Sequence, residues 1–223
     1  MNVSMQHLDY LRTHSGTPAT IGLPDHTIAR FTEEDPLLCQ AISEARDARE
    51  LVDEAWSEAL MGTESEFICH LQSGYLNFYP PETVNPYLPL AARGPWVVTA
   101  YGAVLHDSGG YGMLGFGHAP QPLLDAMNRP HVMANIMTPA FAQPRFMARL
   151  RREVGHARAD GCPFDEFLCL NSGSESVTLA MRISDVNAKL QTSPGARHEG
   201  AKVKMLALHK AFHGRTDRPA QAS

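Results

Sequence analysis

Two short apolar runs on either side of a helical stretch dominate the pattern of residues 164–216. Residues 167–170 form an apolar run of strand length, and the small residues at 171–174 interrupt it. A helical pattern follows at once. A second apolar run, at 203–208, comes after a polar stretch that contains proline and glycine. The order strand, turn, helix, strand predicts one βαβ unit with parallel strands.

The turn at residues 171–174 has two interpretations. The backbone N–H groups that open a helix lack intrahelical acceptors, and glycine lets a phosphate approach them closely. The hydroxyls of Ser172 and Ser174 add further donors. However, Ser172 and Glu175 also have the spacing of a capping box, and helix caps are far commoner than phosphate sites. The turn alone therefore favours a plain cap.

The loop after the second apolar run changes this weighting. In parallel α/β sheets, ligands bind beyond the carboxyl ends of the strands, so we expect the turn and this loop to face one crevice. Phe212 can stack on a flat heteroaromatic ring, and the guanidinium of Arg215 can hold a carboxylate. A phosphate-bearing flat ring beside a carboxylate describes pyridoxal phosphate with an amino-acid-like substrate.

Three ordered motifs carry a resemblance to a known family. The sequences N-S-G-S-E-S at 171–176 and F-H-G-R-T at 212–216 resemble those of the class III (ω-) aminotransferases, which have the fold type I pyridoxal-phosphate architecture. Upstream, H-D-S-G-G-Y-G at 106–112 and L-G-F-G-H-A-P at 114–120 are similar to that family's D-x-x-G-G and G-H-x-x-P motifs. The resemblance extends over residues 94–216 and leaves out the first ninety or so.

The resemblance implies an α/β fold, namely an incomplete fold type I large domain preceded by a helical and extended segment. The expected division is residues 1–93 for that segment and 94–223 for the N-terminal portion of the cofactor-binding domain. The implied reaction moves an amino group from an amine or amino acid to a 2-oxo acid in a homodimer. The implied site comprises Ser172, Gly173 and Ser174 at the phosphate of pyridoxal 5′-phosphate, Phe212 on its ring, His213 beside it, and Arg215 at the substrate carboxylate.

The same chemistry needs a lysine that bonds covalently to the cofactor and an acid against the pyridine nitrogen. The family places both downstream of the F-H-G-R-T loop. The lysines of this chain, at 189, 202, 204 and 210, match neither role, so we predict no catalytic residue. We therefore expect an N-terminal part of an aminotransferase, with an exposed strand edge and an unfilled apolar face.

Two alternatives stay open. The first keeps the fold and changes the pyridoxal-phosphate reaction to that of a racemase, decarboxylase or aminomutase. The second is a non-catalytic or split form of the fold that binds phosphate or a partner chain. Motif resemblance alone does not separate these functions, because one fold hosts many reactions.

Composition excludes several other classes. A net charge of -5 argues against a nucleic-acid partner, and no apolar run approaches membrane-spanning length. Residues 1–13 lack a signal-peptide pattern, so we expect a cytoplasmic protein. The four cysteines include no C-x-x-C pair, which predicts reduced thiols and no zinc site, with Cys169 in the core. His209 and His213 are assigned to a strand end and a loop, so we predict no metal site.

The first half of the chain has its own pattern. Residues 1–34 are mixed and polar, and we expect a loosely ordered arm or a segment that packs on a partner. Asp35 and Pro36 begin a helix whose apolar spacing continues to Leu60 and stops at Gly62. Residues 75–95, rich in proline and tyrosine, are expected to be extended.

Further elements are predicted between residues 96 and 154. Residues 96–99 and 103–107 read as a β-hairpin, and 122–127 and 144–154 as helices. The arginines of the second helix are expected to form a solvated or interface face. The G-x-G-x-x-G at 110–115 does not open a helix, so it is interpreted as a turning loop and not as a dinucleotide site.

Overall fold

The computed structural model describes residues 2–52, 54–76, 87–108, 115–132 and 137–222. These residues form a mixed helical protein with a small three-stranded antiparallel sheet. The chain divides into two compact units, residues 1–132 and residues 133–223, which we call unit 1 and unit 2. The predicted domain boundary between residues 93 and 94 stays a prediction. It marks where the resemblance to the aminotransferases begins, whereas the two units are defined by contacts within the chain.

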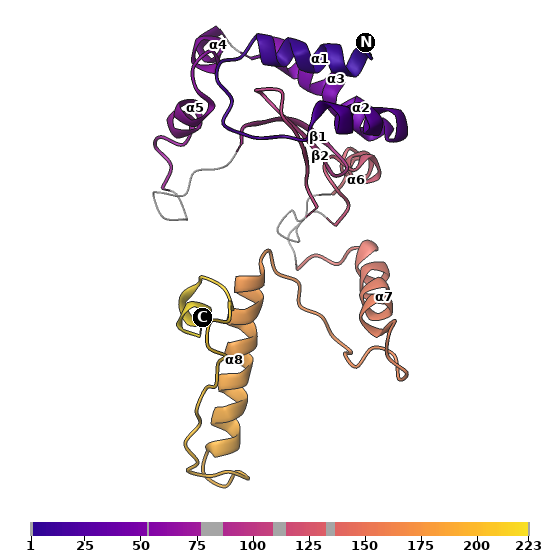
Figure 1. Ribbon diagram of the computed structural model, residues 1–223. Coiled ribbons are helices and arrows are strands. Elements are labelled where there is room, and N and C mark those ends of the chain that lie inside the picture. Colours follow the sequence, from indigo (N-terminus) through magenta and orange to yellow (C-terminus); the bar gives the residue numbers. More distant parts are fainter. Residues whose placement is uncertain (1, 53, 77–86, 109–114, 133–136, 223) are drawn as a thin grey trace. The chain divides into compact units, whose positions relative to one another are not determined.

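Unit 1 contains the sheet, and α3 packs against two of its strands (Figure 1). Strands β1 (Pro89–Arg93), β2 (Trp96–Thr99) and β3 (Val104–His106) lie in the order β1-β2-β3. Both pairs are antiparallel, with Arg93 opposite Trp96 and Val98 opposite Val104. The predicted hairpin is confirmed as β2 and β3. The helices of this unit are α1 (Val3–Thr13), α2 (Asp25–Glu34), α3 (Pro36–Glu50), α4 (Glu54–Leu60), α5 (Glu64–Leu71) and α6 (Gln121–Met127).

The prediction of a loosely ordered arm at residues 1–34 is wrong. Both α1 and α2 are regular helices, and Leu8, Leu11 and Ile28 are fully buried. They join the core that α3 and the sheet supply, so burial of a few well-spaced apolar side chains outweighs the polar composition. The buried core of this cluster consists of Leu8, Leu11, Ile28, Leu38, Ala41, Ile42, Ala45, Trp96, Val98 and Val104.

The predicted helix start at Asp35 and Pro36 is confirmed, but the helix is shorter than predicted. The Asp35 carboxylate accepts from Leu37 N–H at 2.9 Å and from Trp96 Nε1–H at 2.7 Å. The helix ends at Glu50, and α4 begins separately at Glu54. Leu51 is 83% exposed, so the apolar side chains that follow Glu50 no longer pack against the core in line with α3. Without that packing, one continuous helix is not favoured.

A buried carboxylate ties the N-terminal segment to α5. Glu64 is fully buried, and it accepts from the N–H groups of Ala19 and Thr20, both at 2.8 Å, and from the Thr20 hydroxyl at 2.9 Å. Leu88 N–H is 3.4 Å from the same carboxylate. Four donors compensate for its removal from water. Burial, followed by the charge of Glu64, raises the pKa of Tyr101 to about 12.

Unit 2 is helical among its described residues and contains no strand there. Its helices are α7 (Ala142–Gly155), α8 (Gly173–Thr192) and α9 (Asp217–Gln221), so the helices predicted at 144–154 and after Ser172 are confirmed, as is the one at 122–127 in unit 1. The predicted parallel strands at 167–170 and 203–208 are wrong, because both segments lack secondary structure. A strand needs a neighbour for its backbone groups, and no sheet is present beside either segment within the described part.

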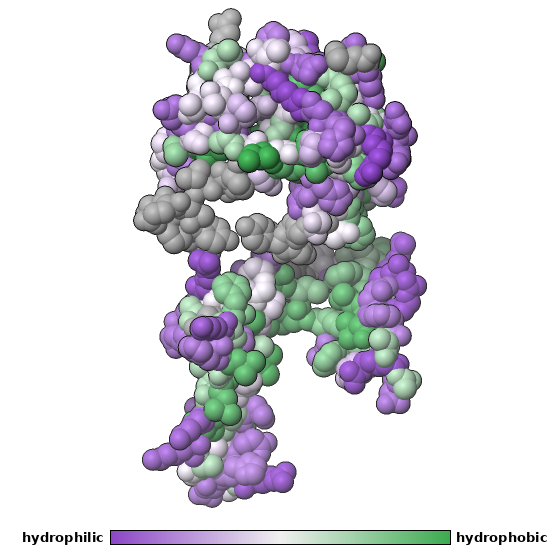
Figure 2. All heavy atoms as spheres, viewed as in Figure 1, coloured by the Kyte–Doolittle hydropathy of each residue, from purple (hydrophilic) through white to green (hydrophobic). Residues whose placement is uncertain are grey.

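The apolar side chains of these two segments consequently stay exposed. Leu168 is 66% exposed, Leu206 is 94% exposed, and Cys169, predicted to lie in the core, is exposed as well. Figure 2 shows hydrophobic residues gathered on the visible surface along α8 and its neighbouring segments. The expected unfilled apolar face is therefore present in unit 2, whereas the expected exposed strand edge is wrong, because neither segment forms a strand.

Some predictions fall outside the described residues. The extended stretch at 75–95 is described only at 75–76 and from residue 87 onward, where it enters β1. The G-x-G-x-x-G segment is described only at Gly115. Within the described ranges, no helix is both long enough and apolar enough to cross a membrane.

Candidate functional site

The N-terminal end of α8 carries the capping box that the sequence predicts. Ser172 Oγ accepts from Glu175 N–H at 3.2 Å. The Glu175 carboxylate accepts in return from the N–H groups of Asn171 at 3.0 Å and Ser172 at 3.1 Å. The cap leaves the N–H groups of Gly173 and Ser174 without an intrahelical acceptor, because they open the helix. Two backbone donors and the positive end of a 20-residue helix therefore remain for an anion.

The loop at 212–216 lies directly against this turn. Arg215 N–H donates to Ser174 Oγ at 3.2 Å, and Thr216 Oγ1–H donates to the Ser174 carbonyl oxygen at 3.3 Å. Gly214, with φ of 120°, is so close that an added Cβ would lie 2.6 Å from Ser174 Oγ. Only glycine tolerates both the positive φ and the lack of space for a Cβ at this position. The two sequence motifs are thus adjacent, although the parallel sheet that was expected to bring them together is not formed.

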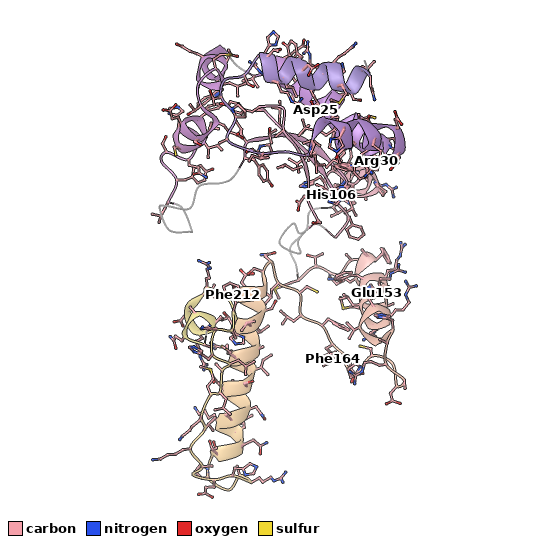
Figure 3. The ribbon with its side chains drawn as sticks, viewed as in Figure 1. Asp25, Arg30, His106, Glu153, Phe164 and Phe212 are labelled. Atoms are coloured by element: carbon pink, nitrogen blue, oxygen red, sulfur yellow. The ribbon has the colours of Figure 1, made fainter. Side chains whose placement is uncertain are left out.

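The aromatic and cationic side chains of the loop lie beside each other. Phe212, labelled in Figure 3 near one end of α8, is 72% exposed. The Arg215 guanidinium carbon is 5.8 Å from the centre of its ring, within the range of a cation–π contact. His213, which lies between Phe212 and Arg215 in the sequence, is half-buried. An open aromatic face and a guanidinium therefore flank the α8 turn.

The donor set of the turn fits a phosphate. The hydroxyls of Ser172 and Ser174 both accept hydrogen bonds from backbone N–H groups, which leaves each O–H able to donate to an anion. An added Cβ on Gly173 would meet no atom within 4 Å, so the space above the first turn is open. The Glu175 carboxylate opposes a phosphate, because it brings negative charge to the same helix end.

Two hydroxyls to which the sequence pattern assigned no role, those of Thr178 and Thr216, hold this arrangement. Thr178 Oγ1 lies 3.0 Å from Thr216 Oγ1 and also donates to the Ser174 carbonyl oxygen at 2.9 Å. Thr178 is four residues after Ser174, so it lies on the same helix face one turn further on. That spacing was the signal that could have identified it.

Among the described residues, the hydrogen bonds that join the turn to the loop involve no lysine and no thiol. Lys189, Lys202, Lys204 and Lys210 are all exposed. The four cysteines are free thiols. Among the residues that the structure describes, no group of three or more histidine, cysteine or acidic side chains could hold a metal ion.

The upstream motif belongs to unit 1. His118 Nε2 lies 3.1 Å from Asp107 Oδ2, which joins the two ends of the 108–117 loop. Gly94 and His118 exchange backbone hydrogen bonds of 3.0 and 2.7 Å. Arg93 also donates to the Ala119 carbonyl oxygen at 3.1 Å. These contacts fix where the motif leaves and rejoins the sheet.

Comparisons with known protein families, with curated proteins and with solved structures found no significant match.

Proposed function

We propose that the chain forms the cofactor-phosphate and ring-binding part of a pyridoxal-phosphate-dependent class III aminotransferase of fold type I. The observation that carries this proposal is the contact between the 171–174 turn and the 212–216 loop. Two motifs some forty residues apart in the sequence share hydrogen bonds through Ser174, as the resemblance requires of a common site. Pyridoxal 5′-phosphate, when bound, supplies an aromatic ring that accepts electrons from the carbon bearing the substrate amino group.

Each residue has a separate task in this proposal. The N–H groups of Gly173 and Ser174, with the hydroxyls of Ser172 and Ser174, hold the phosphate at the end of α8. Phe212 covers one face of the ring, and His213 lines the site beside it. Arg215 orients the substrate by holding its carboxylate with two parallel donors.

The proton transfers of the reaction need groups that these residues do not supply. We propose that the lysine and the acid come from polypeptide beyond the F-H-G-R-T motif or from another chain. The amine or amino-acid donor, the 2-oxo-acid acceptor, the homodimer and the cytoplasmic location are part of the same proposal, carried by the resemblance alone.

A binding experiment tests the phosphate site without requiring turnover. Pyridoxal 5′-phosphate and pyridoxal should be titrated into the chain by calorimetry, and the phosphorylated form should bind more tightly. Gly173→Asp places a carboxylate in the open space above the turn and should weaken phosphate-dependent binding at least about tenfold, because like charges repel at short range.

Ala201→Asp is the matched control, since it adds the same charge at an exposed position outside the turn and the loop. Equal binding of both ligands, or equal losses in both variants, would contradict the proposal. Phosphate-dependent binding without activity when the missing part is supplied would favour the non-catalytic alternative.

A further inference from the structure

Ser174 is contacted by three consecutive residues of the 212–216 loop. Gly214 packs so closely on it that an added Cβ would lie 2.6 Å from Ser174 Oγ and 3.0 Å from Ser174 Cβ. Arg215 N–H donates to Ser174 Oγ at 3.2 Å. Thr216 Oγ1–H donates to the Ser174 carbonyl oxygen at 3.3 Å. The loop therefore meets both the side chain and the backbone of one residue in the first turn of α8.

The two serine hydroxyls of the turn differ in the hydrogen bonds that they accept. Ser172 Oγ accepts from Glu175 N–H, which belongs to the same helix turn. Ser174 Oγ accepts from Arg215 N–H, which lies 41 residues further along the chain. The hydroxyl of Ser174 thus belongs to the turn and to the loop contact at once, whereas that of Ser172 caps its own helix.

The hydroxyl of Ser174 can accept one hydrogen bond and donate another at the same time. It can therefore join the Arg215 N–H to a phosphate at the turn through two consecutive hydrogen bonds. A hydroxyl that donates to an anion becomes a stronger acceptor, because the two bonds polarise each other. A phosphate at the turn should thus strengthen the bond from Arg215 N–H, which holds the backbone that carries the guanidinium.

Thr178 supports the Ser174 backbone at the same place. Its hydroxyl donates to the Ser174 carbonyl oxygen at 2.9 Å and lies 3.0 Å from Thr216 Oγ1. The loop is therefore attached to Ser174 at two points, the side chain and the carbonyl oxygen, and Thr178 contacts the second of them. With the carbonyl oxygen held in this way, we expect a stronger Arg215 contact to order the loop.

We propose that Ser174 couples phosphate binding at the α8 turn to carboxylate binding by Arg215, so that each ligand tightens the binding of the other. This coupling rests on the proposed function, which supplies the phosphate and carboxylate subsites. It is reciprocal, because the coupling free energy is the same whichever ligand binds first. Its sign is informative, since two anions repel each other and a site without this link would bind the carboxylate more weakly once phosphate is present. Ser174 is thus a positioning residue for Arg215 as well as a ligand of the phosphate.

Inorganic phosphate tests the coupling in the full 223-residue chain, because it can fill the turn without a ring that would touch Phe212. NMR supplies two readouts, namely the rate at which the Arg215 amide exchanges with water and the binding of butyrate, followed at the Arg215 Nε–H signal. Saturating phosphate should slow the amide exchange and lower the butyrate dissociation constant, each at least about threefold, since couplings between sites are typically about fivefold or more.

Ser174→Ala removes the shared hydroxyl and should abolish both responses when phosphate is saturating. Ser172→Ala is the matched control, because it removes the other hydroxyl of the turn and leaves the acceptor of Arg215 N–H in place. It should weaken phosphate binding, yet keep both responses at saturation within about twofold of the original. A purely structural role of Ser174 would alter the exchange rate of the Arg215 amide without phosphate, but not its response to phosphate.

The possible outcomes separate this coupling from the proposed function. Phosphate-dependent shifts of the Gly173 and Ser174 amide signals, without either response at Arg215, would overturn the coupling and leave the proposed function standing. Equal losses in the two variants, or butyrate binding that weakens when phosphate is added, would do the same. Unshifted Gly173 and Ser174 signals with both phosphate and pyridoxal 5′-phosphate would overturn the two together. The sign of the coupling in the unaltered chain decides the question even if Ser174→Ala binds no phosphate.

Discussion

Units 1 and 2 have different relations between apolar sequence and burial. In unit 1, fully buried side chains such as Leu38, Ile42 and Val98 come from helices and strands that cover one another. In unit 2, the long helix α8 has no buried residue, although its sequence is no less apolar than that of α3. Apolar residues give a core only where a second layer faces them. The comparison teaches that unit 1 carries its own second layer, while the apolar side chains along α8 in unit 2 have no such layer among the described residues.

The largest expected difference comes from the same substitution made in each unit. Leu38→Ala removes a fully buried side chain of unit 1 and should lower the free energy of unfolding by about 3 kcal/mol. Leu190→Ala, at a position of unit 2 that is 65% exposed, should change it by less than about 0.5 kcal/mol. Denaturant unfolding followed by Trp fluorescence, since Trp96 lies in the core of unit 1, and by circular dichroism measures both. Equal losses of unfolding free energy in Leu38→Ala and Leu190→Ala would contradict the proposed difference between the two units.

The next-largest expected loss of unfolding free energy comes from replacing the buried carboxylate of Glu64 in unit 1. Glu64→Gln replaces an acceptor of up to four hydrogen bonds and should cost about 2 kcal/mol, because buried donors lose their partners. Glu66→Gln, at the exposed first turn of the same helix, is the control and should cost under about 0.5 kcal/mol. A loss at Glu64 no larger than at Glu66 would show that the carboxylate does not hold the N-terminal segment.

The capping box of α8 gives a local effect in unit 2. Ser172→Ala removes the acceptor of Glu175 N–H and should destabilise the first turn by about 1 kcal/mol. Hydrogen exchange of the amides at 174–177 should therefore become about fivefold faster, with no change in the core amides of unit 1. Ser193→Ala, at the other end of α8, should leave those amides unaffected. Faster exchange throughout both units would mean that they unfold together.

The smallest effect is a dependence on pH. Hydrogen bonds from Arg93 lower the pKa of Glu44 below its usual 4.5. Because the folded-state pKa is depressed, its contribution is present above the unfolded-state pKa and is lost as pH falls through the lower folded-state value. The Glu44 side chain is 35% exposed, so solvent screening keeps this contribution below about 1 kcal/mol.

Glu44→Gln should flatten the decline in unfolding free energy below pH 4.5, as measured by denaturant titration at several pH values. Glu153 of unit 2 provides the contrast. A hydrogen bond from Arg152 lowers the pKa of this carboxyl too, but its side chain is 56% exposed on α7. Glu153→Gln should therefore leave the pH dependence unchanged, and an effect as large as that of Glu44→Gln would contradict this account.

Local signals in the sequence predicted the elements that neighbouring residues determine. The Asp35 cap, the Ser172 capping box and the hairpin formed by β2 and β3 all depend on contacts close in the sequence, and all are present. The strands at 167–170 and 203–208 depend on a sheet beside them, which a periodic pattern cannot supply. The helices at 3–34 were missed because a few apolar residues there are buried by distant partners.

The candidate site shows the same division. The pattern of residues 171–176 and 212–216 identified two motifs, and their contact through Ser174 is found in the structure. The supporting pair Thr178 and Thr216 was not identified, because the 3.0 Å contact between its hydroxyl oxygens joins residues 38 apart. Roles in binding a cofactor or substrate stay predictions for all six site residues.

Observation of individual backbone amides during a ligand titration tests the proposed phosphate site most directly. In a ¹H–¹⁵N NMR experiment, pyridoxal 5′-phosphate should shift the amide signals of Gly173, Ser174 and residues 212–216 in a saturable manner. Pyridoxal at the same concentrations should leave Gly173 and Ser174 nearly unchanged, because it lacks the phosphate. Unshifted signals at those two amides, or equal shifts with both ligands, would contradict a phosphate site at the N-terminal end of α8.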